Sequence, residues 1–241
     1  MSKNSIITTI AVCVAIIVGA WFIGRGIKHF REGYAKIFVT GACERNIVSD
    51  LIVWKLSFNS RTRSTQDAFM KIEKDTKIIV DYLKEQGIAP EEIVVRPVSI
   101  AEDIQTVWET GKRTSYGYVG LRTIEVKSAE VSNVERAYQN ISDLYNQGVD
   151  LASETPNYYY TKLNELKMEM LREASADARE RALTIAEGSG SSLGKAISSS
   201  MGVFQIVALH GNDEYSWGGT LNTKSREKTA TITVKTVYKL Q

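Results

Sequence analysis

The stretch TKLNELKMEMLREASADARERALTIAEGSG, residues 161–190, sets the architecture that we predict for this chain. Apolar residues recur in it at every third or fourth position, which is the spacing of one face of an α-helix. This apolar stripe consists of Leu163, Leu166, Met170, Ala174, Ala178, Ala182 and Ile185. Alanines make its second half narrow, and a narrow stripe lets a helix lie close to a sheet. Because residues 195–209 are apolar and strand-forming, we expect the helix to pack on a sheet.

The ends and the polar face of this helix fit the same prediction. Pro156 precedes it, and Gly188 and Gly190 end it, where glycine suits a left-handed cap. Asp177 and Arg181 lie one turn apart on the polar face, so they can form an ion pair worth about 0.3 kcal/mol.

The other elements surround this helix in a regular order. Alternation of apolar and polar residues predicts strands over residues 35–43, 48–59, 92–100, 117–127, 149–153, 196–209 and 229–240. Helical spacing predicts two more helices, over residues 64–86 and 128–147. We interpret residues 101–115 as a hairpin loop or extension and residues 210–228 as a long loop. The order ββα, ββα, βαββ predicts an α+β fold over residues 34–241, with antiparallel sheet or sheets and helices on one face.

The composition narrows the classes of function. Thirty basic residues against 28 acidic ones give a net charge of +2, and no basic run interleaved with aromatic residues occurs. We therefore expect no nucleic acid among the partners. The two cysteines are Cys13, in the apolar N-terminal run, and Cys43, in a predicted strand. We expect neither a disulfide between them nor a Cys-rich zinc site.

The N-terminal run IITTIAVCVAIIVGAWFIG, residues 6–24, contains no charged residue. At a rise of about 1.5 Å per residue, a run of this length just crosses a hydrocarbon core of about 30 Å. We therefore predict a transmembrane anchor and a basic juxtamembrane link in residues 1–33. The residues expected to form the anchor are Ile6, Ile10, Val14, Ile17, Trp21 and Phe22.

Two other interpretations of this run stay open. A cleaved signal peptide is less favoured, because the run is long and no clean small-x-small site follows it. A buried helix of a soluble domain is the third interpretation. The orientation is also open, since Lys3 favours a cytoplasmic N-terminus whereas Arg25, Lys28 and Arg31 favour the opposite.

Short motifs, four of which contain glycine, follow one another in a definite order. They are Val39-Thr40-Gly41, Asp50, Gln86-Gly87-Ile88, Tyr116-Gly117-Tyr118, Asn146-Gln147-Gly148-Val149 and the Asp-Ala-Arg-x-x-Ala core from Asp177 to Ala182. Together with the order of elements, these motifs resemble the SIMPL domain family, also called DUF541, over residues 35–241. One departure is Ala42-Cys43-Glu44, which replaces the family's second glycine.

The resemblance implies a bacterial envelope protein that is exported or attached to a membrane. For this chain it implies a single pass through the inner membrane, with the folded domain in the periplasm. The family is associated with tolerance of oxidative stress and, in some members, with ring-like or channel-like homo-oligomers, while a eukaryotic relative acts as a signalling adaptor. No catalytic residues are established for the family, so the resemblance implies no catalytic site and no cofactor.

Three features suggest chemistry, and each has a simpler explanation. Residues 190–194, GSSLG, match the letters of a nucleophile elbow, but here a helix precedes and a strand follows, the reverse of the required order. His210 with Asp213 and Glu214 suggests a weak metal site, and a solvated loop is the simpler explanation. Cys43 suggests a redox-active thiol, and a structural thiol is simpler. We therefore expect no enzyme, no metal and no small-molecule substrate.

Aromatic residues are the candidate interaction sites. Tyr158, Tyr159 and Tyr160 are consecutive and cannot all face one core, and Tyr215 and Trp217 lie beside glycines in the long loop. We expect a homo-oligomer that uses this loop as its contact. The charged loop residues expected to form a polar rim are Asp213, Glu214, Lys224, Arg226 and Lys228. We also expect the loop to contribute little to stability. An envelope binding or adaptor module, active as a monomer or dimer, is the alternative, and a hydrolase or redox enzyme is the third hypothesis.

Overall fold

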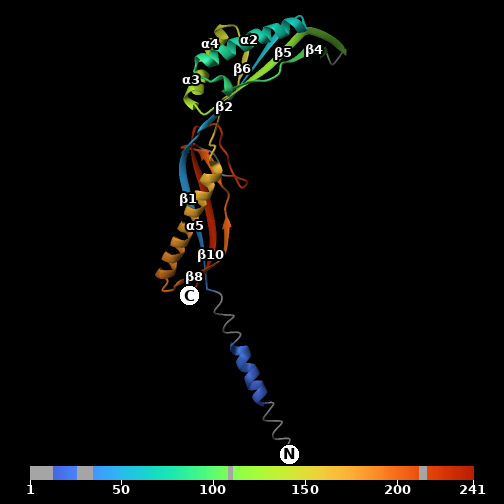
Figure 1. Cartoon of the computed structure of the whole chain (residues 1–241). Coiled ribbons are helices and arrows are strands. Elements are labelled where there is room, and N and C mark those ends of the chain that lie inside the picture. The colour runs from blue at the N-terminus through green and yellow to red at the C-terminus, as the bar shows by residue number, and fades with distance from the viewer. Residues whose placement is uncertain (1–12, 26–34, 108–110, 212–215) are drawn as a thin grey trace, which may run out of the picture. The chain divides into compact units, whose positions relative to one another are not determined.

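The computed structural model of the protein describes residues 13–25, 35–107, 111–211 and 216–241. They form an N-terminal helix over residues 13–25 and two compact units (Figure 1). The described residues of the first unit fall within Met1–Glu44, Lys167–Phe204 and Thr231–Gln241, and those of the second within Arg45–Leu166 and Gln205–Ala230. Each unit is therefore assembled from segments that are far apart in the sequence.

The helix over residues 13–25 carries large apolar side chains on its surface. Of the predicted anchor residues, Val14, Ile17, Trp21 and Phe22 are exposed on this helix, and Ile6 and Ile10 lie outside the described residues. The rings of Trp21 and Phe22 meet edge to face, with their centroids 5.1 Å apart. Within the described parts of the chain, no helix combines the length and the apolar content needed to cross a membrane.

The second unit is built on an antiparallel sheet. Its long strands are β2 (Leu51–Thr62) and β5 (Lys112–Ser128), which pair in unbroken register from Ile52 opposite Ser128 to Thr62 opposite Tyr118. Its short strands are β3 (Ile93–Val95) and β4 (Ser99–Val107), paired with β5, and β6 (Leu151–Ser153) and β7 (Asn157–Tyr159), paired with β2. Its helices are α2 (Thr65–Glu85), the 3₁₀ turn η1 (Pro90–Glu92), α3 (Val131–Gln139) and α4 (Ser142–Asn146).

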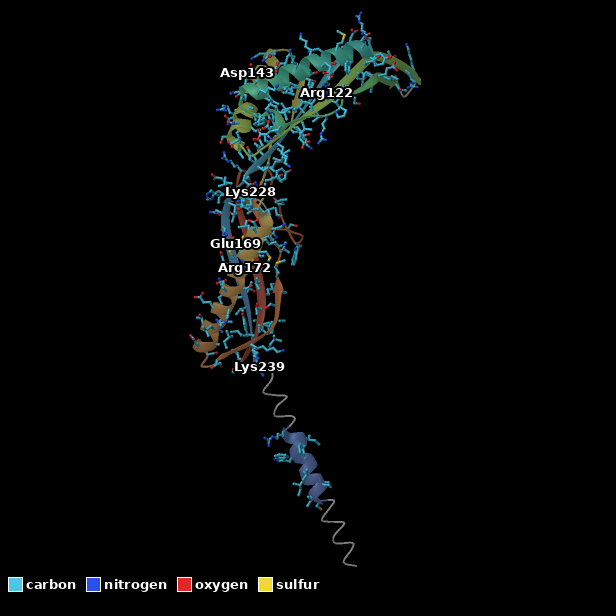
Figure 2. All side chains as sticks on the ribbon, in the orientation of Figure 1. Arg122, Asp143, Glu169, Arg172, Lys228 and Lys239 are labelled. Atoms are coloured by element: carbon cyan, nitrogen blue, oxygen red, sulfur yellow. The ribbon has the colours of Figure 1, made fainter. Side chains whose placement is uncertain are left out.

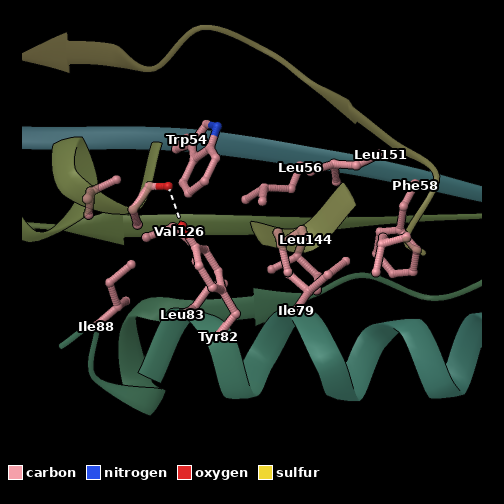
Figure 3. Close-up of a cluster of buried hydrophobic side chains, with 14 of the residues drawn as sticks. Trp54, Leu56, Phe58, Ile79, Tyr82, Leu83, Ile88, Val126, Leu144 and Leu151 are labelled. Atoms are coloured by element: carbon pink, nitrogen blue, oxygen red, sulfur yellow. Dashed lines mark hydrogen bonds between the residues drawn. The ribbon is translucent and has the colours of Figure 1, made fainter. Parts of the chain in front are cut away.

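The core of this unit lies between β2, β5 and α2. Trp54, Leu56 and Phe58 alternate with more exposed residues along β2 and point towards α2 (Figure 3), so the strand face predicted from the sequence is confirmed. The Tyr82 side chain enters this core with its polar end paired, since its hydroxyl donates to the carbonyl of Ala137 at 2.7 Å (Figure 3). Burial, with a smaller contribution from a nearby aspartate charge, raises the pKa of Tyr82 to about 12.

The first unit packs one long helix, α5 (Leu163–Gly188), against a sheet in the order β1-β10-β8. These strands are β1 (Lys36–Val48), β10 (Glu227–Leu240) and β8 (Leu193–Met201). Strand β9 (Gln205–Ala208), whose residues are assigned to the second unit, also pairs with β10. Along β1, Ile37, Val39 and Cys43 are buried, whereas Phe38 and Thr40 are exposed. This alternation shows that α5 covers one face of the sheet.

The predicted narrow stripe of α5 is confirmed, with one correction. The buried residues fall at every fourth position and are Leu166, Met170, Ala174, Ala178, Ala182 and Ala186. Ile185, which the sequence placed on the stripe, is 51% exposed. A row of residues spaced by four winds slowly around a helix, so Ala186 continues the row and Ile185 falls outside it.

The close approach that the alanines permit occurs at Gly41 of β1. A Cβ atom on Gly41 would lie 2.1 Å from the carbonyl oxygen of Ala174 and 2.4 Å from the amide nitrogen of Ala178. Both are backbone atoms of α5, which cannot move aside as a side chain can. The strand and the helix are therefore in contact backbone to backbone at this position.

The expectation of an α+β fold with antiparallel sheets is confirmed, and five details of the element order are corrected. Of residues 101–115, which were interpreted as a hairpin loop or extension, 101–107 lie in β4 and 112–115 in β5. The strand expected over residues 92–100 is divided between β3 and β4. The helix expected over residues 128–147 is two helices, because Asn140 ends α3 and α4 begins afresh. Residues 196–209 hold parts of β8 and β9, and β7 is a strand that the sequence did not predict.

Candidate interaction surfaces

In the long loop between β9 and β10, residues 216–222 are held by hydrogen bonds to β9. The Gln205 side chain donates to the carbonyl of Ser216 and accepts from the amide of Thr220, both at 2.6 Å. The backbone of Ile206 bonds to Thr220 at 2.7 Å and to Asn222 at 2.9 Å. This part of the loop therefore runs beside β9 as an added extended segment.

Trp217 stands at the tip of this held segment. Its side chain is 99% exposed, the most exposed of the large hydrophobic residues in the described chain. The amide of Gly219 bonds to the carbonyl of Ser216 at 3.1 Å, which closes a tight turn under the indole, and Gly219 has a positive φ of 97° that glycine tolerates. The indole is thus presented to solvent on an ordered turn. The predicted neighbour Tyr215 lies outside the described residues.

The three consecutive tyrosines lie at and just after strand β7. Tyr158 is partly buried against the core, and its backbone amide donates to the carbonyl of Thr223 at 2.7 Å. Burial, helped by the Glu135 carboxylate, raises the pKa of Tyr158 to about 12. Tyr159 is exposed at the strand surface and Tyr160 is partly exposed. Of the three, Tyr159 is the side chain best placed to meet a partner.

Lys228, labelled in Figure 2, holds the end of the long loop in place. Its side chain is buried among residues of the second unit. Its ammonium group donates to the Ser49 hydroxyl at 2.5 Å, to the carbonyl of Tyr158 at 3.1 Å and to the carbonyl of Ser225. These partners satisfy all the N–H donors of a lysine without an opposite charge. Arg226 pairs with Glu135 of α3 at 2.8 Å.

These contacts correct two expectations for the loop. Lys228 is 1% exposed, so it is a buried anchor and not part of a polar rim. Replacing the whole loop would also remove the bonds of Ile206, Tyr158 and Lys228, so the loop does contribute to stability. A single substitution at Trp217 is therefore the cleaner probe of assembly.

Lys228 makes the stability of the protein depend on pH. Burial lowers the pKa of Lys228 from 10.5 to about 8, so between these values the unfolded chain binds more protons than the folded protein. Stability therefore rises as the pH increases through this range. We expect the free energy of unfolding to be about 2 kcal/mol higher at pH 9.5 than at pH 7 on account of this group.

Urea unfolding at the two pH values measures this effect, with Lys228→Met as the comparison. The Met variant has no amino group to titrate, so its stability should lack the rise. Tyr82 and Tyr158 do not obscure the result, because their raised pKa values act mainly above pH 10. An equal pH dependence in both proteins would mean that Lys228 keeps an ordinary pKa.

In the first unit, acidic side chains of α5 reach the edge of β1. The Asp177 carboxylate accepts from the amide of Ala42 at 2.8 Å and from Nε of Arg181 at 2.9 Å, so the predicted Asp177–Arg181 pair is confirmed. The Arg181 bond, followed by the Ala42 amide, lowers the pKa of Asp177. The Cys43 thiol donates to Glu173 at 3.0 Å. Cys43 is buried and its neighbour is a carboxylate, which does not stabilise a thiolate, so the structural interpretation is favoured.

A groove of about 570 Å³ lies between β1 and α5 beside these residues. Its strand side is formed by Phe38, Val39 and Thr40, and its helix side by Asp177, Glu180, Arg181, Thr184 and Ile185. It therefore combines exposed apolar side chains with acidic groups. The groove could not be predicted from local sequence patterns, because its two walls are more than a hundred residues apart in the chain.

The other chemical candidates are not brought together. Residues 190–192 lie between α5 and β8, and residues 193–194 begin β8, so a helix precedes and a strand follows, as expected. His210 is exposed in a turn after β9, and its expected companions Asp213 and Glu214 lie outside the described residues. Across the residues that the structure describes, no group of His, Cys, Asp or Glu side chains is arranged to hold a metal ion.

These observations define a mixed α+β protein with antiparallel sheets, a long β-hairpin and an exposed tryptophan loop. The chain belongs to the SIMPL family, whose model, described as a protein of unknown function (DUF541), matches residues 37–238. The match extends over parts of both compact units. No curated protein matches the chain.

Proposed function

We propose that this SIMPL-family chain is a non-enzymatic, membrane-anchored protein of the bacterial cell envelope that assembles with copies of itself through the loop that carries Trp217. The observation that carries the proposal is the 99% exposure of the Trp217 indole on a turn held by Gln205. A large apolar ring kept in water at a loop tip is typical of a residue that a partner covers.

The hydrogen-bonded turn at Trp217 lowers the entropic cost of such a contact. Because Ser216 and Gly219 are already hydrogen-bonded, little conformational freedom is lost when a partner covers the indole. A buried tryptophan in an interface is worth about 2 kcal/mol or more. Copies confined to one membrane also meet at a raised effective concentration, so a modest contact at each loop suffices for assembly.

The membrane anchor in this proposal rests on the uncharged run at residues 6–24. The exposed apolar side chains of Ile17, Trp21 and Phe22 on the helix over residues 13–25 are suited to a lipid environment. We place the anchor in the inner membrane and the folded units in the periplasm, following the properties associated with the family. We propose that any link to oxidative-stress tolerance does not involve a redox step at Cys43, because this thiol is buried.

The proposal is tested on the full-length chain by comparing Trp217→Ser with Tyr116→Ser. Tyr116 is an exposed aromatic residue of β5 and serves as the matched control. We expect the wild-type chain to stay with membranes after an alkaline wash and to have a multiple of the monomer mass in detergent. Trp217→Ser should reduce that mass at least about twofold without lowering the melting temperature, because an exposed side chain contributes little to stability.

Tyr116→Ser should leave both the mass and the melting temperature unchanged. A Trp217→Ser variant with the full assembled mass would exclude the loop as the contact. A wild-type chain of monomer mass would favour the alternative of an envelope adaptor that acts alone. Release of the wild-type chain by the alkaline wash would remove the anchor from the proposal.

A further inference from the structure

Along one side of strand β1, the backbone amide and carbonyl groups do not pair with any other strand of the described chain. Within the described chain, β1 pairs with β10 alone, so its other side is an edge of the sheet. The carbonyl of Ala35, just before the strand, accepts from Leu240 of β10, whereas the amide of Ala42 turns to Asp177. Since alternate residues of a strand point their amides in opposite directions, Phe38 and Thr40 present theirs at the edge, as Ala42 does.

The protein protects only part of this edge. Asp177 covers the amide of Ala42, which blocks strand pairing at that end of β1. Phe38 and Thr40 border the open groove instead, and Phe38 is 75% exposed. Exposed edges of apolar strands are ordinarily covered or charged, because they pair readily with another extended chain.

We propose that the groove beside β1 is a binding site for an extended, mainly apolar polypeptide segment with one basic side chain, which pairs with the backbone of Phe38 and Thr40. This is recognition by strand addition, in which backbone hydrogen bonds supply affinity and alternate side chains supply specificity. The site lies in a different unit from Trp217, so it stands independently of self-assembly through the loop.

The surroundings of the edge set the pattern of the bound segment. Residues of an added strand that point away from α5 lie beside Phe38, where a β-branched or aromatic side chain packs well. Residues that point towards α5 meet the helix side of the groove. Ile185, 51% exposed, offers an apolar contact there.

The acidic charge on the helix side of the groove favours a basic residue in the bound segment, next to the position that contacts Ile185. The carboxylate of Asp177 is already paired with Arg181, whereas no ion pair joins Glu180 within the described residues. Two carboxylates and one guanidinium leave the helix side of the groove with a net charge of −1. A lysine or arginine of the bound segment beside Glu180 is therefore favoured and an acidic residue is disfavoured.

Fluorescence anisotropy of a labelled peptide with the sequence TVKVVVT tests this proposal on the full-length protein in detergent. Its second, fourth and sixth residues are placed to lie beside Phe38, and its lysine beside Glu180. We expect saturable binding, and dissociation constants at least about tenfold higher for the acidic peptide TVEVVVT and for the Glu180→Lys variant with the original peptide. A peptide methylated on alternate amides should show no saturable binding, because it cannot form the ladder.

The variant Thr40→Pro removes the edge amide while leaving the bonds to β10 intact, which is the setting in which a strand tolerates proline. We expect it to raise the dissociation constant of TVKVVVT at least about tenfold, and Thr40→Val, which keeps the amide, to change it by less than about twofold. Equal binding of the methylated and unmethylated peptides to the wild-type protein would overturn the proposal, whether or not Thr40→Pro folds. Loss of assembled mass in Thr40→Pro would also overturn it, since a second copy would then occupy the edge.

Discussion

We expect Gly41→Ala to lower the free energy of unfolding of the unit that contains β1 and α5 by about 3 kcal/mol, and Gly41→Val to lower it further. The added methyl group would lie 2.1 Å from the carbonyl oxygen of Ala174 and 2.8 Å from Cα of Ala178. Both distances are far inside van der Waals contact. The obstacle is the backbone of α5, so relief requires the helix to move away from the sheet, which separates the packed alanine row from β1.

Hydrogen exchange followed by mass spectrometry is the measurement suited to this effect, because it reports on each segment separately. Peptides from α5 and β1 should lose protection in Gly41→Ala, in parallel with a lower midpoint of urea unfolding. Gly188→Ala is the matched control, since a Cβ atom at Gly188 meets nothing within 4 Å. We expect that control to lie within about 0.5 kcal/mol of the wild-type protein. Equal protection in both variants would show that α5 does not pack on Gly41.

The second large effect is expected for Ala178→Glu, which should destabilise the same unit by about 3 to 5 kcal/mol. Ala178 is fully buried and its backbone touches the Cβ position of Gly41. A glutamate side chain has no space between helix and strand, and its carboxylate would lose its hydration without gaining a cation. The destabilisation should lessen below about pH 5, because protonation removes the buried charge.

Arg179→Glu is the control for Ala178→Glu. It introduces the same side chain at the next position of α5, where the residue is exposed. We expect its melting temperature to stay within a few degrees of the wild-type value, as is typical of surface substitutions. If the two glutamate variants had the same melting temperature, the alanine row would not be the packed face of the helix.

Local sequence patterns were sufficient to predict the buried face of those strands and helices that pack against the core on one side only. The alternation in β2 identified Trp54, Leu56 and Phe58 as core residues, because a half-buried strand must change face at every residue. The alanines of α5 identified a close helix–sheet contact for a similar reason, since small side chains on a helix face let a strand backbone approach closely. These inferences depend only on periodicity and side-chain size.

Features that depend on a distant partner were missed or misplaced. Strand β7 has little pattern of its own, and it exists because residues Asn157 to Tyr159 pair with Leu51 to Val53 of β2. The hairpin arm of β4 is polar, and it is held by its register with β5. Ile185 was placed on the buried row because the helical period alone cannot say which side of the stripe the sheet reaches.

The same division holds for the candidate sites. Sequence patterns were enough to select Trp217, since a tryptophan beside glycines in a long charged segment is noticeable without any fold. Burial of Lys228 and the open edge of β1 arise only after folding. Lysine is ordinarily exposed, and Lys228 is buried because Ser49, Tyr158 and Ser225 converge on its ammonium group from three parts of the chain. The groove at Phe38 and Thr40 requires α5 to lie beside β1, and no local pattern encodes a contact across more than a hundred residues.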